Sequence, residues 1–219
     1  MTSEVTGMGN YIYTIGRELG SGGYTVAKLL AERLGIKLYD KELLAIAAKD
    51  SGLSEALFHN ADEKPTSSLL YSLVMGNYSA ASSTLGFNEM PLNDQLFLIQ
   101  SKTVKKVAEQ GSCVIIGRCA DYILRDDPSV ISVFIHAPID ARVERAINVY
   151  EVPKDKAEDI CLKNDKTRAN FYNYYSDQKW GMCKTYDLSL DSSLLGIDGC
   201  VEQIISFTNL HEAHKGSKI

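Results

Sequence analysis

The sequence of 219 residues lacks any stretch that approaches the roughly 20 consecutive apolar residues of a membrane-spanning helix. It also lacks an excess of positive charge, and its formal net charge of −5 at pH 7 disfavours a nucleic-acid-binding protein. The five cysteines form no C-x-x-C pair and the four histidines are scattered, so no metal site built from protein ligands alone is predicted. The first residues show no basic start followed by an apolar run. These absences favour a cytoplasmic protein that binds neither membranes nor nucleic acid.

The composition that remains is that of an ordinary globular protein. Hydrophobic residues make up 45% and charged residues 23% of the chain. No internal repeat is visible. A chain of this length fits one domain with room for an inserted lobe, so we expect a single domain over residues 1–219.

The first fifty residues show a strand–helix–strand pattern. "YIYTI" (11–15) is β-branched and aromatic, as in a strand, and "IKLYD" (36–40) is a second candidate strand. Between them, Val26, Leu29, Leu30 and Leu34 recur at the spacing of one helix face, which ends at Gly35. This order predicts a parallel βαβ unit.

Further strands follow later in the chain. The runs "SCVIIGR" (112–118) and "SVISVFIHA" (129–137) are almost continuously apolar, as expected for central parallel strands that are buried on both faces. "YDLSLDSS" (186–193) is a last candidate strand, and helices are expected over 92–111, about 153–176 and 196–210. Residues 64–94 are predicted to form short helices and loops in a mobile lobe. The pattern predicts a three-layer α/β domain of about five parallel strands.

Residues 16–25, "GRELGSGGYT", lie between the first strand and the first helix. Backbone N–H groups of such a loop can surround one anion, and the helix adds roughly half a positive charge. The usual phosphate loop is G-x-x-x-x-G-K-[ST], whose lysine reaches the β- and γ-phosphates. Gly20, Ser21 and Gly22 match its centre, but Gly23 occupies the lysine position and the loop is one residue too long. The loop alone fits either a phosphate site or a turn without a ligand.

Polar groups follow four of the predicted strands. Arg17, Asp40 and Arg118 come directly after three of them, and Arg142 and Arg145 begin the helix after a fourth. Ligands of open α/β sheets bind beyond the carboxyl ends of the strands, and guanidinium groups bind phosphate through two hydrogen bonds. Arginines that converge beside a glycine loop therefore favour an anion site over solvated surface groups.

Three blocks, "GRELGSGGYTVAKLLAERLGIKLYDKEL", "VIIGRCADYIL" and "KNDKTRANFYNYY…YDLSLDSSLLGIDG", together resemble the cytidylate kinase-like family of P-loop proteins. The resemblance runs from about residue 11 to residue 207. It implies a kinase-like parallel sheet with a helical acceptor lobe (residues 41–110) and a lid (residues 140–180). It also implies transfer of a phosphoryl group from ATP, with Mg²⁺, to a nucleoside monophosphate, of which CMP or dCMP is the acceptor that the family name indicates.

The resemblance also implies roles for particular residues. The ATP phosphates would be bound by the glycine loop, whose residues are Gly20, Ser21, Gly22, Gly23, Tyr24 and Thr25, with the Thr25 hydroxyl also a candidate ligand of Mg²⁺. The acceptor would be bound by Asp40, Arg118 and Asp121. The catalytic groups would be Arg17, Arg142, Arg145, Asp165 and Arg168, of which Asp165 and Arg168 match the D-x-x-R of the lid and share one helix face.

The chain departs from the family pattern in the loop. Gly23 replaces the lysine, and loss of such a cation should slow the reaction strongly. Arg17, or less favourably Lys28, would then compensate, and a Gly23→Lys substitution is expected to raise the affinity for ATP. A nucleotide-binding protein without catalysis is the alternative function, and an unrelated α/β interaction protein is a third.

The aromatic run "FYNYY" (171–175) has three interpretations: packing against a neighbouring helix, stacking on a base, or a contact in a homodimer.

Overall fold

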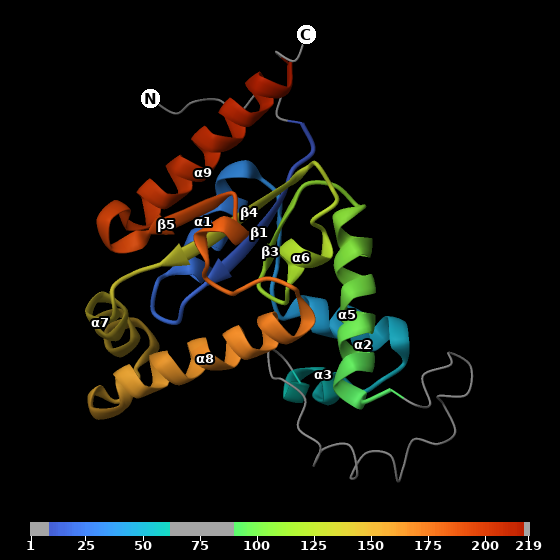
Figure 1. The fold of residues 1–219 in the computed structure, drawn as a ribbon, viewed down its shortest axis with the longest axis horizontal. Helices are drawn as coiled ribbons and strands as arrows, with labels where there is room; N and C mark the ends of the chain where they lie inside the picture. The colour runs from blue at the N-terminus through green and yellow to red at the C-terminus, as the bar shows by residue number, and fades with distance from the viewer. Residues whose placement is uncertain (1–8, 62–89, 217–219) are drawn as a thin grey trace.

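The computed structural model of the chain describes residues 9–61 and 90–216. Their centre is one five-stranded parallel sheet in the order β2-β3-β1-β4-β5. The strands are β1 (Ile12–Arg17), β2 (Lys37–Tyr39), β3 (Cys113–Ile116), β4 (Val130–His136) and β5 (Leu188–Asp191). Helices cover both faces of the sheet (Figure 1). The predicted three-layer α/β architecture is confirmed.

One face of the sheet is covered by α1 (Gly23–Leu34) and α9 (Ser192–Gly216). Alternate residues of the strands, among them Ile15 and Val133, pack there against Leu30 of α1 and Ile204 of α9. This burial follows from the period-2 alternation of a strand and the 3.6-residue period of the helices. Helix α9 is interrupted at Gly196, whose backbone is not helical.

The other face is covered by α2 (Glu42–Ser51), α5 (Leu92–Ala108) and α6 (Ala120–Ile123). Ile12 and Ile115 of the sheet contact Leu43 of α2 and Val104 of α5 within one buried cluster. The face is therefore apolar along the carboxyl-terminal half of α5.

The amino-terminal half of α5 leaves the sheet and packs with α2 and α3 (Glu55–Ala61). Leu44, Phe58 and Leu96 form a separate small core there. This helical layer lies where the sequence predicts an inserted lobe. Most of the predicted mobile segment of residues 64–94 lies outside the described residues.

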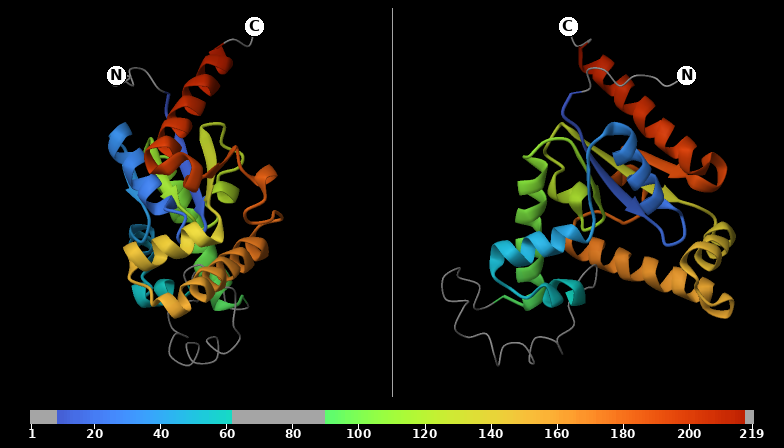
Figure 2. Two further views of the ribbon diagram at one scale, coloured as in Figure 1. Left: turned by 90° about the vertical axis from the view of Figure 1, so that its left-hand side faces the viewer. Right: turned by 180° about the vertical axis from the view of Figure 1, so that it is seen from behind.

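Helices α7 (Ile139–Tyr150) and α8 (Ala157–Tyr175) follow β4, with short 3₁₀ turns at Lys154–Lys156 and Cys183–Thr185. Figures 1 and 2 show α8 crossing the end of the sheet at which β1 terminates. Its carboxyl-terminal half packs on α5, where the ring centroids of Phe97 and Tyr175 lie 3.9 Å apart. Phe171 and Tyr172 are buried in the same cluster, so these aromatic residues pack against neighbouring helices.

Four of the five cysteines are buried and none forms a disulfide. Burial raises the pKa of the Cys113 and Cys200 thiols to about 11, so these two cysteines act as small apolar groups. In the part of the chain that the structure describes, no helix is long and apolar enough to span a membrane.

Candidate active site

The glycine loop connects the central strand β1 to α1. Gly20 and Gly22 have φ values of 83° and 79°, which side chains other than glycine rarely adopt. A Cβ at Gly20 would also collide with the backbone carbonyl oxygen of Arg142, and it would lie 2.9 Å from the Arg142 Cα. The N–H groups of the first helical turn have no intrahelical acceptor, so the loop and helix N-terminus present donors for an anion.

A buried ionic network holds the backbone of the glycine loop in place. The Arg142 side chain on α7 donates to the Asp165 carboxylate on α8 and to the Leu19 carbonyl oxygen, 3.3 Å away. The Leu19 N–H donates to the second oxygen of Asp165 at 2.8 Å. Glu18 lies 3.3 Å from the Arg142 Nε and also accepts from the Ala137 N–H at 3.1 Å. Helices α7 and α8 are thus bound to the loop backbone.

The network changes the roles expected for two residues. Arg142 is 6% and Asp165 9% exposed, and each is occupied by protein partners. Unlike Arg118, neither of them is among the residues that line the pocket described below, so we place them as positioning residues of the loop rather than as groups that contact a substrate. Burial raises the pKa of Glu18, while the Ala137 N–H and the Arg142 charge lower it.

Arg145 lies beside Gly22 of the loop, whereas the Arg142 backbone lies beside Gly20. A Cβ at Gly22 would lie 3.3 Å from the Arg145 Cζ and 2.6 Å from Ile197 Cδ1. The Arg145 guanidinium therefore lies close to the loop at Gly22, whereas the Arg142 guanidinium is held by Asp165. On the α9 side, the Ser192 hydroxyl donates to the Ser21 carbonyl oxygen at 2.5 Å.

The remaining predicted loop residues lie toward solvent. Tyr24 is 47% exposed and Thr25 is exposed in the first turn of α1. Lys28 is exposed one turn later and lies 3.9 Å from Glu32, which directs its charge to the helix surface. Lys28 is therefore a poor substitute for a loop lysine.

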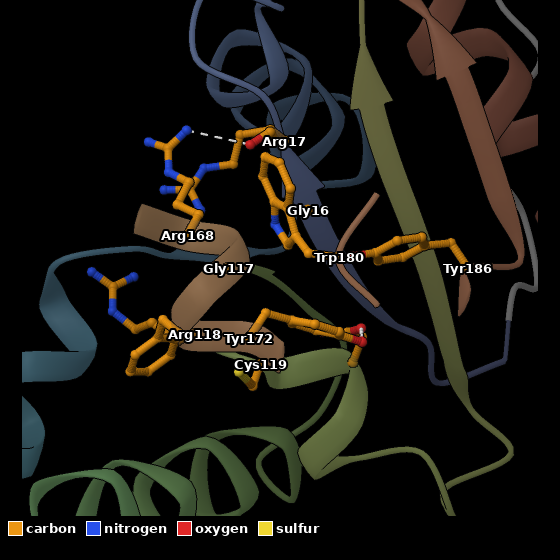
Figure 3. Close-up of a pocket in the computed structure, with 11 residues that line it drawn as sticks. Gly16, Arg17, Gly117, Arg118, Cys119, Arg168, Tyr172, Trp180 and Tyr186 are labelled. Carbon is orange, nitrogen blue, oxygen red and sulfur yellow. Dashed lines mark hydrogen bonds between the residues drawn. The ribbon is translucent and has the colours of Figure 1, made fainter. Parts of the chain in front are cut away.

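A pocket opens beside the loop at the carboxyl ends of β1 and β3. It is lined by Gly16, Arg17, Gly117, Arg118, Cys119, Asp121, Arg168, Phe171, Tyr172, Trp180 and Tyr186. Figure 3 shows the guanidinium groups of Arg17, Arg118 and Arg168 on one side of this pocket and the rings of Trp180 and Tyr186 on the other. The pocket thus combines arginine side chains with aromatic rings.

Arg118 is held in place by its backbone and by Asp40. Gly117, Arg118 and Cys119 have φ values of 64°, 56° and 55°, a left-handed turn in which the two non-glycine residues are strained. The Arg118 Nη1 donates to Asp40 at 3.0 Å and to the Ile116 carbonyl oxygen at 3.1 Å. The side chain is only 2% exposed, so this buried charge is paired with Asp40, and the residue lines the pocket.

Arg168 contacts the end of β1. Its Nη1 donates to the Arg17 carbonyl oxygen at 3.3 Å (Figure 3). Asp165 and Arg168 share the face of α8 that packs on the loop, as predicted, but they bind different partners. Asp165 binds Leu19 and Arg142 instead of holding the Arg168 guanidinium.

Asp121 also lines the pocket, where it contacts Tyr172. Its carboxylate accepts a hydrogen bond of 2.6 Å from the Tyr172 hydroxyl, whose oxygen is also 2.8 Å from the Gln178 side chain. Burial raises the pKa of Asp121, and the hydrogen bond from Tyr172 partly opposes this. Asp121 thereby fixes the orientation of a ring that lines the pocket.

The sequence connects Trp180 and Tyr186 with the "FYNYY" run only through the alternatives of a base-stacking surface or a dimer contact, and the structure places both in the lining of the pocket. Trp180 lies in the loop that follows α8, and Tyr186 opens the predicted strand of residues 186–193 just before β5. Both pack on Phe134 of β4, with ring centroids 5.1 and 4.9 Å away. The signal for these two residues in the sequence is that they follow closely after the aromatic run "FYNYY" (171–175). Among the described residues, no group of three or more His, Cys, Asp or Glu side chains is arranged to hold a metal ion.

The chain is similar in structure to known proteins. It matches a solved structure of an uncharacterized protein from Eubacterium ventriosum with 31% identity and a TM-score of 0.68, covering 91% of this chain and 98% of the other. No curated protein matches.

Two kinases share the fold at lower similarity. The shikimate kinase from Bacteroides thetaiotaomicron has 13% identity and a TM-score of 0.51, with 92% of this chain and 99% of the kinase covered. The gluconokinase from Sinorhizobium meliloti has 12% identity and a TM-score of 0.53, with 95% and 98% covered. The model of the cytidylate kinase-like family matches residues 12–194. The chain therefore belongs to the cytidylate kinase-like family.

Proposed function

We propose that the protein transfers the γ-phosphoryl group of ATP to a nucleoside monophosphate, with CMP or dCMP as the acceptor. The observation that carries the proposal is the convergence of Arg17, Arg118 and Arg168 on a pocket directly beside the glycine loop. Phosphoryl transfer needs mainly positioning and neutralisation of charge, and this arrangement supplies both.

The glycine loop would bind the ATP phosphates. Its donors are the N–H groups at the start of α1, and the network of Arg142 and Asp165 fixes their direction. Arg145, beside Gly22, adds positive charge close to the same loop. The loop backbone thus replaces most of the water that the phosphates lose on binding.

The three-arginine pocket would bind the acceptor. Arg118, which is buried and fixed by Asp40, would grip the acceptor phosphate together with Arg168. Trp180, which is only partly buried, offers a face on which a base can stack. An acceptor with both a phosphate and a planar base uses both sides of the pocket, which supports a nucleotide over shikimate or gluconate.

Mg²⁺ would arrive with ATP and neutralise its phosphates. The exposed Thr25 hydroxyl in the first turn of α1 fits the protein ligand for that ion. A single hydroxyl is enough because Mg²⁺ usually keeps several waters and binds substrate phosphates.

We propose that residues 140–180 act as a lid and that residues 41–110 contribute to acceptor binding. Helix α8 carries Asp165 and Arg168 on the face that contacts the loop and β1. Movement of α8 would therefore expose or cover the site between loop and pocket, and closure would exclude water from the transferring group.

The proposal is tested by incubating the protein with MgATP and one acceptor at a time: CMP, dCMP, UMP, AMP, GMP, shikimate or gluconate. We expect ADP to form fastest with CMP or dCMP. Arg118→Ala should abolish binding of the acceptor while leaving the affinity for MgATP unchanged. Arg125→Ala, which removes an exposed arginine that lies over the Tyr122 ring, is the matched control. Unaltered acceptor affinity in a folded Arg118→Ala variant would contradict the assignment of the pocket.

A nucleotide-binding protein without catalysis is the second candidate function. Gly23 at the lysine position favours it, because the loop itself carries no cation. It predicts that MgATP stabilises the protein against heat whereas no acceptor stimulates ADP formation.

A further inference from the structure

Gly23 stands at the position from which the usual phosphate loop extends its lysine. It is the first residue of α1, and its φ is not positive, so the backbone conformation alone does not require glycine there. The requirement comes from a neighbour. A Cβ at Gly23 would collide with the Cβ of Arg17 and would lie 3.1 Å from the Arg17 Cγ and 3.3 Å from the Ile135 Cβ.

The colliding atoms cannot move aside easily. The Arg17 Cβ is attached to the backbone of β1, which pairs with β4 opposite Ile135. The next residue continues this pairing, because the Glu18 N–H donates to the Ile135 carbonyl oxygen at 3.1 Å. The Arg168 Nη1 also donates to the Arg17 carbonyl oxygen. Arg17 and Gly23 are therefore sterically matched: the arginine stem fills the space that a side chain at position 23 would need.

The Arg17 side chain begins beside the loop and lines the acceptor pocket (Figure 3). It therefore lies between the place proposed for the ATP phosphates and the place proposed for the acceptor. A guanidinium in this position has a planar fork of donors that suits two phosphate oxygens at once.

Other nearby cations are placed less well. Arg142 is held by Glu18 and Asp165 below the loop, and Lys28 lies beside Glu32 on the helix surface. Arg145 lies close to the loop at Gly22 but is not among the residues that line the pocket. Arg145 is thus the main rival for contact with the γ-phosphate.

We propose that Arg17 supplies, from the end of β1, the positive charge that a lysine at position 23 supplies in the usual phosphate loop. This inference rests on the proposed function. In the reaction, the bond between the γ-phosphorus and the oxygen bridging to ADP breaks, and ADP keeps that oxygen. A bond forms from an acceptor phosphate oxygen to the γ-phosphorus. Arg17 stays protonated and binds the charge on the moving phosphoryl group.

The proposal predicts a selective effect on the γ-phosphate. Arg17→Gln keeps the stem and removes the charge, so it should lower the affinity for MgATP at least about tenfold and change the affinity for MgADP much less. It should also lower kcat by about 10²- to 10³-fold. Arg145→Ala, as the rival, should lower the two affinities to a similar extent. Arg125→Ala controls for the loss of an exposed arginine.

The steric match predicts a swap. Gly23→Lys alone should reduce the affinity for MgATP or the stability of the fold, because its Cβ collides with Arg17. Arg17→Gly alone should lose the preference for ATP over ADP. The double variant Arg17→Gly/Gly23→Lys should regain affinity for MgATP relative to Arg17→Gly, which a double-mutant cycle measures.

Titration calorimetry with MgATP and MgADP gives these affinities without any need for turnover, and circular dichroism verifies the fold of each variant. An unchanged ratio of the two affinities in Arg17→Gln, or tighter MgATP binding by Gly23→Lys alone, would overturn the inference. If the wild-type protein phosphorylates none of the acceptors, the proposed function fails. The ratio of affinities in Arg17→Gln still decides whether Arg17 binds the γ-phosphate.

Discussion

Replacing Asp165 by Asn should both destabilise the protein and weaken its binding of ATP. The Asp165 carboxylate is 9% exposed and accepts from the Arg142 guanidinium and from the Leu19 N–H of the glycine loop. An Asn amide has one acceptor oxygen, so it can keep the bond to Leu19 only by turning its NH₂ group toward the guanidinium. Arg142 then remains buried with Glu18, 3.3 Å away, as its acidic partner.

The size of the effect follows from this geometry. Breaking a buried ion pair by removing one charge typically costs about 3–5 kcal/mol. Because Glu18 still compensates the charge of Arg142, we expect the free energy of unfolding to fall by about 3 kcal/mol, the lower end of this range. For a chain of this length that corresponds to a fall in Tm of about 6–12 °C.

The assay is denaturant unfolding followed by circular dichroism, together with calorimetric titration of MgATP. Asp177→Asn, at an exposed position just beyond α8, is the matched control. The double variant Arg142→Met/Asp165→Leu should be more stable than either single variant, since apolar groups can replace a buried pair. It should still bind MgATP weakly because Leu19 has lost its acceptor. Stability and ATP affinity of Asp165→Asn equal to those of Asp177→Asn would refute the positioning role.

Three further predictions concern the loop, the pocket and the lid. Gly20→Ala should destabilise the protein by at least about 2 kcal/mol more than Gly35→Ala, because both positions have positive φ but only Gly20 faces a backbone atom, and urea unfolding of the two variants measures the difference. Since burial raises the pKa of Asp121, the wild type should lose stability relative to Asp121→Asn as the pH rises from about 4 through that raised pKa, and equal pH profiles would contradict this. Amide hydrogen exchange in residues 150–180 should slow when ATP and CMP are both present, and identical exchange with and without them would make α8 part of the scaffold.

The fold could be predicted from the sequence because its signals are local. Val114 and Ile115 lie within a continuous apolar run, as buried parallel strands require, and Leu30 recurs on a helix face directed at the sheet. The end of β1 was predicted two residues too early, because Gly16 and Arg17 read as the start of the loop, whereas both continue the pairing of β1 with β4. The sequence places the start of this helix at about residue 153, whereas α8 begins at Ala157, because Pro153 and a 3₁₀ turn precede it.

The site could be predicted only in part. Arg118 was identified from its position after a buried strand, and the structure brings it to the pocket. The partners of Asp165 could not be predicted, because a D-x-x-R spacing defines a helix face but not the loop that packs on it. The collision between Arg17 and a side chain at position 23 depends on how closely β1 and α1 approach, which no sequence pattern encodes. The sequence alone predicts that Gly23→Lys raises the affinity for ATP. The geometry predicts that it lowers this affinity or the stability of the fold.

Phosphorus NMR of a mixture of the protein, MgATP and CMP tests the central claim most directly, because it follows donor and acceptor in one sample. We expect the ATP γ-phosphate signal to fall while signals of ADP and CDP grow in equal amounts, and we expect the Arg118→Ala variant to form no CDP. Growth of free phosphate and ADP without CDP, or no change at all in a protein that calorimetry shows to bind MgATP, would contradict it.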